Sequence, residues 1–210
     1  MSDETIWIKR ARAGDQEAFA RLIETYQTPI YNLTYRMLGD AAEADDAAQE
    51  AFLRAYTRLS TYDSRRSFKT WLFSIASHYC IDLLRRRRLT WLSLDEPLPS
   101  IYVAALAEPN PGPEEQTVRG EQTALIQRHL ARLSLEDRAA IVMRYWYDLS
   151  YEEIAEVCGG TVSAIKSRLH RARLALAEAL VDERRDASRR DVPSERLHPP
   201  ERLYRMEAMR

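Results

Sequence analysis

The sequence is poor in cysteine and has no long apolar run. Only two cysteines occur among the 210 residues, Cys80 and Cys158, and no Cys-x-x-Cys pair is present, so neither a disulfide framework nor a zinc cluster is indicated. No apolar run approaches the roughly 20 residues of a membrane span. The N-terminus, Met1 to Glu4, is acidic rather than basic as in a signal peptide. These absences predict a cytoplasmic protein.

Glycine is also scarce, with six residues, and the apolar periodicity is close to 3.6 wherever it is clear. This pattern predicts an all-α protein. Charged residues make up 30% of the chain but nearly cancel, leaving a net charge of -1. Nucleic-acid binding would therefore have to come from segregation of charge along the chain. The length suits two small domains.

Residues 149–176 carry the strongest local pattern. Ser150 and Glu153 have the spacing of a capping box, which predicts a helix start. Gly159-Gly160 predicts a turn, and Thr161 is a suitable N-cap for a second helix. The apolar residues of that second helix recur at helical spacing and predict its buried face: Val162, Ile165, Leu169 and Ala172. Two helices joined by a glycine turn indicate a helix-turn-helix.

The opposite side of the second helix is basic and bears hydroxyl groups. It has no acidic residue from Val162 to Ala177. A solvated surface is the common explanation of such a pattern, but the two-helix context favours contact with a DNA major groove. The predicted contacts are Ser163, Lys166, Ser167, Arg168, His170 and Arg171.

The N-terminal part predicts three further helices: residues 5–13, a helix capped by Asp15 that ends at Gly39 with a bend near Pro29, and a helix from about residue 41. The polar side of the third helix carries acidic residues and no basic one: Asp45, Asp46, Gln49 and Glu50. First-turn acid preference explains Glu43 to Asp46 but explains Glu50 poorly. The more specific interpretation is that this acidic face binds a basic protein partner.

Residues 68–88 predict a helix with an aromatic and apolar stripe and arginines at both ends. Trp71 falls off the stripe, on a mixed face that can stack on bases of opened DNA. The arginines can engage phosphates, although a solvated charge run remains an alternative for the last four. The predicted contacts with opened DNA are Arg65, Arg66, Lys69, Trp71, His78, Arg85, Arg86, Arg87 and Arg88.

Proline and lost periodicity between Leu94 and Glu115 indicate a linker. The predicted organisation is a first domain at 1–92, a flexible linker at 93–117, a four-helix second domain at 118–181 and a charged, disordered tail at 182–210.

Three of these segments together resemble the extracytoplasmic-function sigma factors of the sigma-70 family. They are D-D-A-A-Q-E-A-F-L-R-A-Y (45–56), F-K-T-W-L-F-S-I-A-S-H-Y-C-I-D-L-L-R-R-R-R (68–88) and L-S-Y-E-E-I-A-E-V-C-G-G-T-V-S-A-I-K-S-R-L-H-R-A-R (149–173). The resemblance covers about residues 10–180. It implies that the first domain is sigma region 2 and the second is sigma region 4, with its helix-turn-helix.

The resemblance also implies the partners and roles. Residues 45–50 would bind the clamp helices of core RNA polymerase, whose flap would be a further contact. Residues 65–88 would recognise and melt the promoter -10 element, with the loop Tyr62 to Ser67 receiving a flipped base. The basic helix would read the -35 element. An anti-sigma factor would be a regulatory partner, and no small-molecule substrate is expected.

Two departures from the family pattern stand out. The family commonly carries Arg-Asn where this chain has Ser77-His78, which puts the -10 preference in question. The residues beyond Val181 extend past the two regions that make up the smallest members of the family.

Two other classes of function remain open from the residues alone. A helix-turn-helix regulator would bind an operator as a dimer, but this function does not account for the acidic helix. A protein-binding adaptor leaves the basic helix unexplained. An enzyme is least favoured, because no carboxylate pair, nucleophile set or phosphate loop appears. No catalytic residue, cofactor or metal site is predicted.

Overall fold

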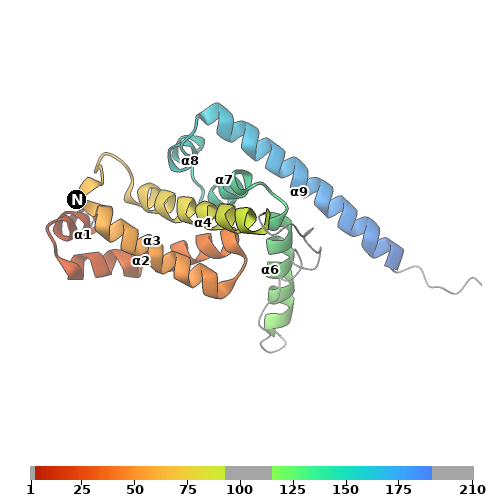
Figure 1. The fold of residues 1–210 in the computed structure, drawn as a ribbon, viewed down its shortest axis with the longest axis horizontal. Helices are drawn as coiled ribbons and strands as arrows, with labels where there is room; N and C mark the ends of the chain where they lie inside the picture. The colour runs from red at the N-terminus through yellow and green to blue at the C-terminus, as the bar shows by residue number, and fades with distance from the viewer. Residues whose placement is uncertain (1–2, 93–114, 191–210) are drawn as a thin grey trace, which may run out of the picture. The chain divides into compact units, whose positions relative to one another are not determined.

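The computed structural model describes residues 3–92 and 115–190, and these residues form helices and short connections without a strand (Figure 1). The predicted all-α fold is thus confirmed. Most of the predicted linker and the end of the predicted tail lie outside the described residues. Residues 1–176 form one compact unit, and residues from Ala177 onward form a second.

Helices α1 (Asp3–Arg12), α2 (Gln16–Leu38) and α3 (Ala41–Arg58) begin and end where local chemistry dictates. The Asp15 side chain accepts a hydrogen bond from the backbone N–H of Ala18 at 3.1 Å, as predicted. Gly39 ends α2 in the left-handed region, with φ of 85°. Asp40 then caps α3 by accepting from the backbone N–H of Glu43 at 2.9 Å.

Small residues let α3 lie close to α2. Ala44, Ala47, Ala51 and Ala55 are fully buried, so no large side chain separates the two helices. The Thr34 hydroxyl of α2 lies 2.8 Å from the carbonyl oxygen of Ala44 in α3. Helix α2 continues through Pro29 as a single element, so the predicted bend does not interrupt it.

The 3-10 turn η1 (Leu59–Thr61) and the loop from Tyr62 lead into α4 (Phe68–Leu92). Helix α4 contacts α2, α3, α7 and α8, and it is buried on more than one side (Figure 1). Leu72 and Ala76 are fully buried, as the predicted stripe requires, but so are Phe73 and Cys80 outside that stripe.

The C-terminal helices are α6 (Glu115–Ala131), α7 (Leu135–Trp146), α8 (Tyr151–Cys158) and α9 (Val162–Arg190). Ile141, Ile154, Ile165 and Leu169 are buried in their core. The predicted buried face of α9 is confirmed, with Val162 half-buried at its start.

The bounds of two elements differ from the predicted ones. Helix α6 begins at Glu115, within the predicted linker, because Pro113 is the last proline before it. Helix α9 continues to Arg190, within the predicted tail. No proline or glycine interrupts the chain between Val162 and Arg190, so nothing local ends the helix earlier.

The turn between α8 and α9 provides a test of this local chemistry. Gly159 has φ of 65° and ψ of 54°, and its N–H donates to the carbonyl of Ala155. A Cβ there would meet nothing within 4 Å, so the cost of Gly159→Ala is backbone strain alone, roughly 1–2 kcal/mol. We expect a lower thermal unfolding midpoint by circular dichroism.

Gly160→Ala is the matched control. Gly160 does not have a positive φ and is equally open around its Cβ position. Its replacement should leave the unfolding midpoint unchanged or raise it slightly. Equal destabilisation by the two variants would contradict the strain argument.

Candidate nucleic-acid and protein interfaces

The first turns of α9 present the predicted recognition face (Ser163, Lys166, Ser167, Arg168, His170 and Arg171). Ser163, Lys166, Ser167 and His170 are exposed, opposite the buried Ile165 and Leu169. Thr161 caps the helix, its hydroxyl accepting from the backbone N–H of Ala164 at 3.2 Å. The exposed side chains of the recognition face have a size and polarity that allow hydrogen bonds to base edges or phosphates in a major groove.

Two arginines of the recognition face are engaged within the protein. An Nη of Arg171 lies 3.1 Å from a carboxylate oxygen of Asp137, whose side chain is only 12% exposed. Arg168 is half-buried, and its buried Nη1 has no hydrogen-bond partner among the described residues. The Arg171–Asp137 ion pair therefore also links α9 to α7, a role that periodicity alone does not indicate.

A complete capping box begins α8. The Ser150 hydroxyl accepts from the backbone N–H of Glu153 at 3.1 Å, and the Glu153 carboxylate accepts from the backbone N–H of Ser150 at 2.8 Å. The backbone hydrogen bond from Ser150 lowers the pKa of Glu153, outweighing the opposite effect of burial. The predicted capping box is confirmed.

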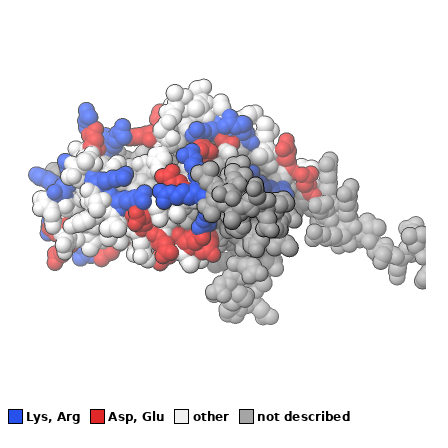
Figure 2. All heavy atoms as spheres, in the orientation of Figure 1, with Lys and Arg blue, Asp and Glu red and all other residues white. Residues whose placement is uncertain are grey.

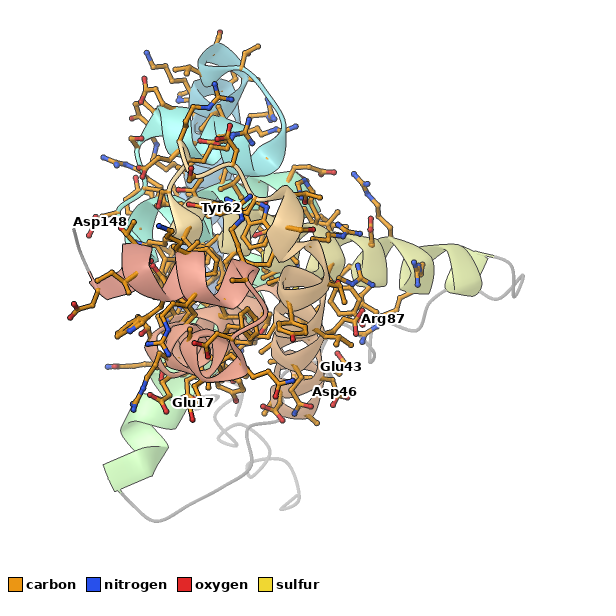
Figure 3. The ribbon with its side chains drawn as sticks, turned by 90° about the vertical axis from the view of Figure 1, so that its left-hand side faces the viewer. Glu17, Glu43, Asp46, Tyr62, Arg87 and Asp148 are labelled. Carbon is orange, nitrogen blue, oxygen red and sulfur yellow. The ribbon has the colours of Figure 1, made fainter. Side chains whose placement is uncertain are left out.

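Helix α3 presents the predicted acidic face (Asp45, Asp46, Gln49 and Glu50). Asp45, Asp46 and Gln49 are exposed, and the Gln49 amide donates to Asp45 at 2.8 Å. Glu50 is half-buried and pairs with Arg54 at 2.6 Å. The negative charge therefore concentrates toward the start of the helix, where Figure 3 shows Asp46 beside Glu43.

Sequence reasoning missed an apolar groove next to the acidic face. The groove has a volume of about 500 Å³ and lies between α2 and α3, lined mainly by Phe19, Ile23, Phe52, Leu53 and Tyr56. Leu53 is 59% exposed and Tyr56 is 40% exposed. The only signal in the sequence is that both fall outside the buried alanine stripe of α3.

Most predicted arginines near α4 are held in ion pairs. Arg65 pairs with Asp63 at 2.7 Å and lowers the pKa of that carboxyl to about 2. Arg66, in the loop before α4, pairs with Glu156 of α8 at 3.0 Å. Two arginines of α4 pair with other helices: Arg85 with Glu136 of α7 at 2.7 Å, and Arg87 with Glu43 of α3. Figure 2 shows basic side chains in a row across the middle of the molecule, with acidic ones gathered beside them. The carboxylates of these ion pairs partly neutralise the paired arginines.

The remaining predicted contacts on α4 differ in exposure. His78 and Arg86 are exposed, whereas the Lys69 ammonium donates to the carbonyl of Tyr147 at 3.2 Å. Trp71 is half-buried, and the centroid of its ring lies 5.1 Å from the centroid of the Tyr62 ring. The side chain of Arg88 lies outside the described residues.

Ser77 and His78, the pair that departs from the family pattern, point in different directions. Ser77 is 2% exposed, and its hydroxyl has no hydrogen-bond partner within the described part of the chain. Only His78 is therefore accessible to a partner on this helix surface.

Family models match both parts of the chain. Sigma-70 region 2 matches residues 22–90, and Sigma-70 region 4 matches residues 123–176. The chain belongs to the sigma-70 family. Within it, the chain is a sigma factor of the extracytoplasmic-function (ECF) group, since relatives of that group match along most of its length.

Two relatives illustrate this match. The ECF RNA polymerase sigma factor SigW of Bacillus subtilis is 38% identical over 180 residues, covering 83% of this chain and 95% of SigW. The RNA polymerase sigma-H factor of Pseudomonas aeruginosa is 35% identical over 184 residues, covering 82% of this chain and 91% of the relative.

Solved structures share the fold. CnrH, in complex with the cytosolic domain of CnrY, has a TM-score of 0.63 at 24% identity, covering 87% of this chain and 99% of CnrH. The sigma factor RpoE from Bartonella quintana, in complex with the anti-sigma factor NepR, has a TM-score of 0.60 at 23% identity, covering 77% of this chain and 96% of RpoE.

The described part of this sigma factor contains no helix long and apolar enough to cross a membrane. Nor do its described residues include a group of three or more side chains suited to hold a metal ion.

The capping box of this sigma factor makes its stability depend on pH. The folded-state pKa of Glu153 lies below its ordinary value of 4.5. Its contribution is therefore fully present above pH 4.5 and is lost as the pH falls through the lower folded-state pKa. Glu153→Gln should flatten the fall of the thermal midpoint below pH 4.5.

Glu152→Gln is the control, since Glu152 is exposed in the same helical turn and does not cap Ser150. It should keep the wild-type pH dependence. A Glu153→Gln profile that parallels the wild type would show that the capping carboxylate does not contribute in this way.

Proposed function

We propose that this sigma factor binds core RNA polymerase through α3, melts and recognises the -10 element through α4, and reads the -35 element through α9. The observation that carries the proposal is the separation of an acidic face with an apolar groove on α3 from a basic face on α9. A dimeric helix-turn-helix regulator, the main alternative, would leave the α3 surface without a partner.

The α3 surface suits a basic, helical protein partner such as the polymerase clamp helices. Asp45 and Asp46 would attract cations of the partner and set its orientation. The exposed Leu53 and Tyr56 beside them offer apolar area whose burial can supply affinity. The acidic face and the apolar groove together provide both electrostatic attraction and apolar area for a partner.

The α9 surface suits a duplex. Lys166 is exposed close to the N-terminus of its helix, with its ammonium 5.7 Å from the centroid of the Tyr151 ring. A positive N-terminal turn attracts phosphates through both the side chain and the free backbone N–H groups. Ser163 and Ser167, one turn apart, add donors and acceptors for base edges or phosphates.

The ion pairs near α4 are compatible with DNA binding. The arginines of these pairs are 33–89% exposed, and such solvent-exposed pairs contribute only about 0–1 kcal/mol each. Phosphates can therefore replace carboxylates as partners of Arg66, Arg85 and Arg87 at small cost. The same exchange would free Glu156, Glu136 and Glu43.

The proposal includes further partners and a division of labour. The polymerase supplies the chemistry of transcription, so we assign this sigma factor no catalytic residue and place it in the cytoplasm with its polymerase. Contact with the polymerase flap and regulation by an anti-sigma factor belong to the same proposal. The two solved structures named above are both complexes: CnrH with the cytosolic domain of CnrY, and RpoE with the anti-sigma factor NepR.

Charge reversal tests the polymerase surface. Asp46→Lys should abolish co-elution with core RNA polymerase on size exclusion, because it places a like charge opposite the basic partner. Leu53→Ala should weaken co-elution by roughly ten-fold through loss of buried apolar area. Both residues are exposed, so the helical circular dichroism spectrum should remain that of the wild type.

Glu178→Lys is the control, an exposed acidic residue on α9 with the same change in net charge. It should co-elute as the wild type does. Failure of the wild type to co-elute would remove the assignment as a sigma factor of this polymerase. Unchanged co-elution of Asp46→Lys would move the polymerase contact away from α3.

Removal of a single cation tests the duplex surface. Lys166→Ala should weaken binding of the full chain to a -35 duplex and reduce the slope of log affinity against log salt by about one. Titration by fluorescence anisotropy at several salt concentrations measures both quantities. Arg171→Ala should have a smaller DNA effect and a lower unfolding midpoint, because it also removes the pair with Asp137. Equal loss of folding and DNA binding in Lys166→Ala would contradict the assignment.

A further inference from the structure

An ion pair between Glu43 and Arg87 links α3 to α4. Glu43 lies in the first turn of α3, where its backbone N–H donates to the Asp40 side chain that caps the helix. Arg87 lies on α4, within the run of arginines 85–88. Figure 3 shows Arg87 and Glu43 next to each other, with Asp46 close to Glu43. The pair therefore joins the helix proposed to bind polymerase to the helix proposed to bind DNA.

The Glu43 side chain is a neighbour of the acidic face of α3. Glu43 precedes Asp46 by three residues, so their Cβ atoms lie about 5–6 Å apart on the helix surface. Asp46 is exposed, whereas Glu43 is half-buried. A basic side chain of the polymerase that binds Asp46 is therefore close enough to attract the Glu43 carboxylate as well.

The ion pair leaves the Glu43 carboxylate incompletely satisfied. Its Oε1 pairs with Arg87, but its Oε2 is buried and has no hydrogen-bond partner among the described residues. A buried acceptor without a donor is unfavourable, so this pair is weaker than a fully hydrogen-bonded one. The dipole of α3 stabilises a negative charge in its first turn whether or not Arg87 is bound. Glu43 can therefore exchange Arg87 for another cation at small cost.

Arg87 differs from the neighbouring paired arginines in the location of its partner. Arg66 and Arg85 pair with residues of α8 and α7, whereas Arg87 pairs with α3. The Arg87 side chain is 33% exposed, so its guanidinium can turn toward a phosphate without crossing the core. A cation that competes for Glu43 makes Arg87 available to DNA. A phosphate that binds Arg87 makes Glu43 available to the polymerase by the same factor, because linkage is reciprocal.

We propose that Glu43 is a positioning residue that couples polymerase binding to DNA binding. It holds Arg87 in the free protein and releases it when a basic side chain of the polymerase engages the first turn of α3. Arg87 then binds a phosphate of the opened strand. The coupling rests on the proposed sigma function. An ion pair whose side chains are about a third exposed changes an equilibrium by no more than roughly five-fold, so we expect a coupling of about three-fold.

Glu43→Gln, compared in the free and the polymerase-bound chain, tests the coupling. Binding of fluorescent (dT)12 is measured by anisotropy for the full chain alone and for the full chain saturated with core RNA polymerase, with core polymerase alone as the background. The variant should bind the strand about three-fold more tightly in the free chain, because Arg87 is released. Its affinity in the complex should equal that of the wild type, because Arg87 is already released there. A purely structural role of Glu43 would not produce this difference between the two states.

Two further variants separate the release of Arg87 from a change in net charge. Glu43→Asp keeps the negative charge but shortens the side chain by one methylene, so it should also tighten binding by the free chain. Glu17→Gln is the matched control, an exposed acidic residue in the first turn of α2. It should leave the affinity of the free chain unchanged. In an Arg87→Ala background, Glu43→Gln should have no effect, because the arginine that Glu43 holds is absent.

Arg87→Ala gives the complementary measurement. It should weaken (dT)12 binding more in the polymerase complex than in the free chain, where Glu43 already holds the arginine. An equal loss in both states would overturn the coupling and leave the sigma function intact. So would the absence of tightening by Glu43→Gln in the free chain, or tightening that persists without Arg87. Failure of the wild type to co-elute with core polymerase would instead overturn the function on which the coupling rests.

Discussion

The structure depends on the burial of α4 from more than one side. Residues around most of its circumference are apolar or small, so no single packing surface removes them all from water. Leu72 and Ala76 are fully buried, and the rings of Phe73 and Tyr147 meet edge-on with their centroids 4.7 Å apart. The contacts of α4 with α2, α3, α7 and α8 all follow from this requirement. A helix covered in this way keeps only a narrow exposed strip, which includes His78 and Arg86.

The functional surfaces occupy what this packing leaves exposed. The acidic face and the apolar groove lie on the outer side of α3, because the alanines of its inner side are used against α2. The basic face of α9 lies opposite Ile165 and Leu169 for the same reason. Charged residues near α4 meet carboxylates from other helices until a stronger anion replaces them. Electrostatic recognition is therefore built on residues that contribute little to the core.

Helix α1 packs against α2 and the turn η1. Its buried residues, Ile8 and Ala11, attach it to the first helices, and its polar residues then face the loop before α4. The Tyr26–Glu4 hydrogen bond converts a first-turn acid, which any helix might carry, into an oriented acceptor. A cavity with a single carboxylate among cations follows from that placement.

The sequence by itself determined the all-helical fold, the caps at Asp15 and Ser150, the buried stripe of α9 and the family, because each depends on spacing within a few turns. It could not reveal that Phe73 and Cys80 are buried or that Leu53 and Tyr56 are exposed, because both depend on which helices pack together. The partners of Arg66, Arg85 and Arg171 likewise come from distant helices. Local periodicity decides which side of a helix is apolar; only the tertiary structure decides what covers each side and which charges meet.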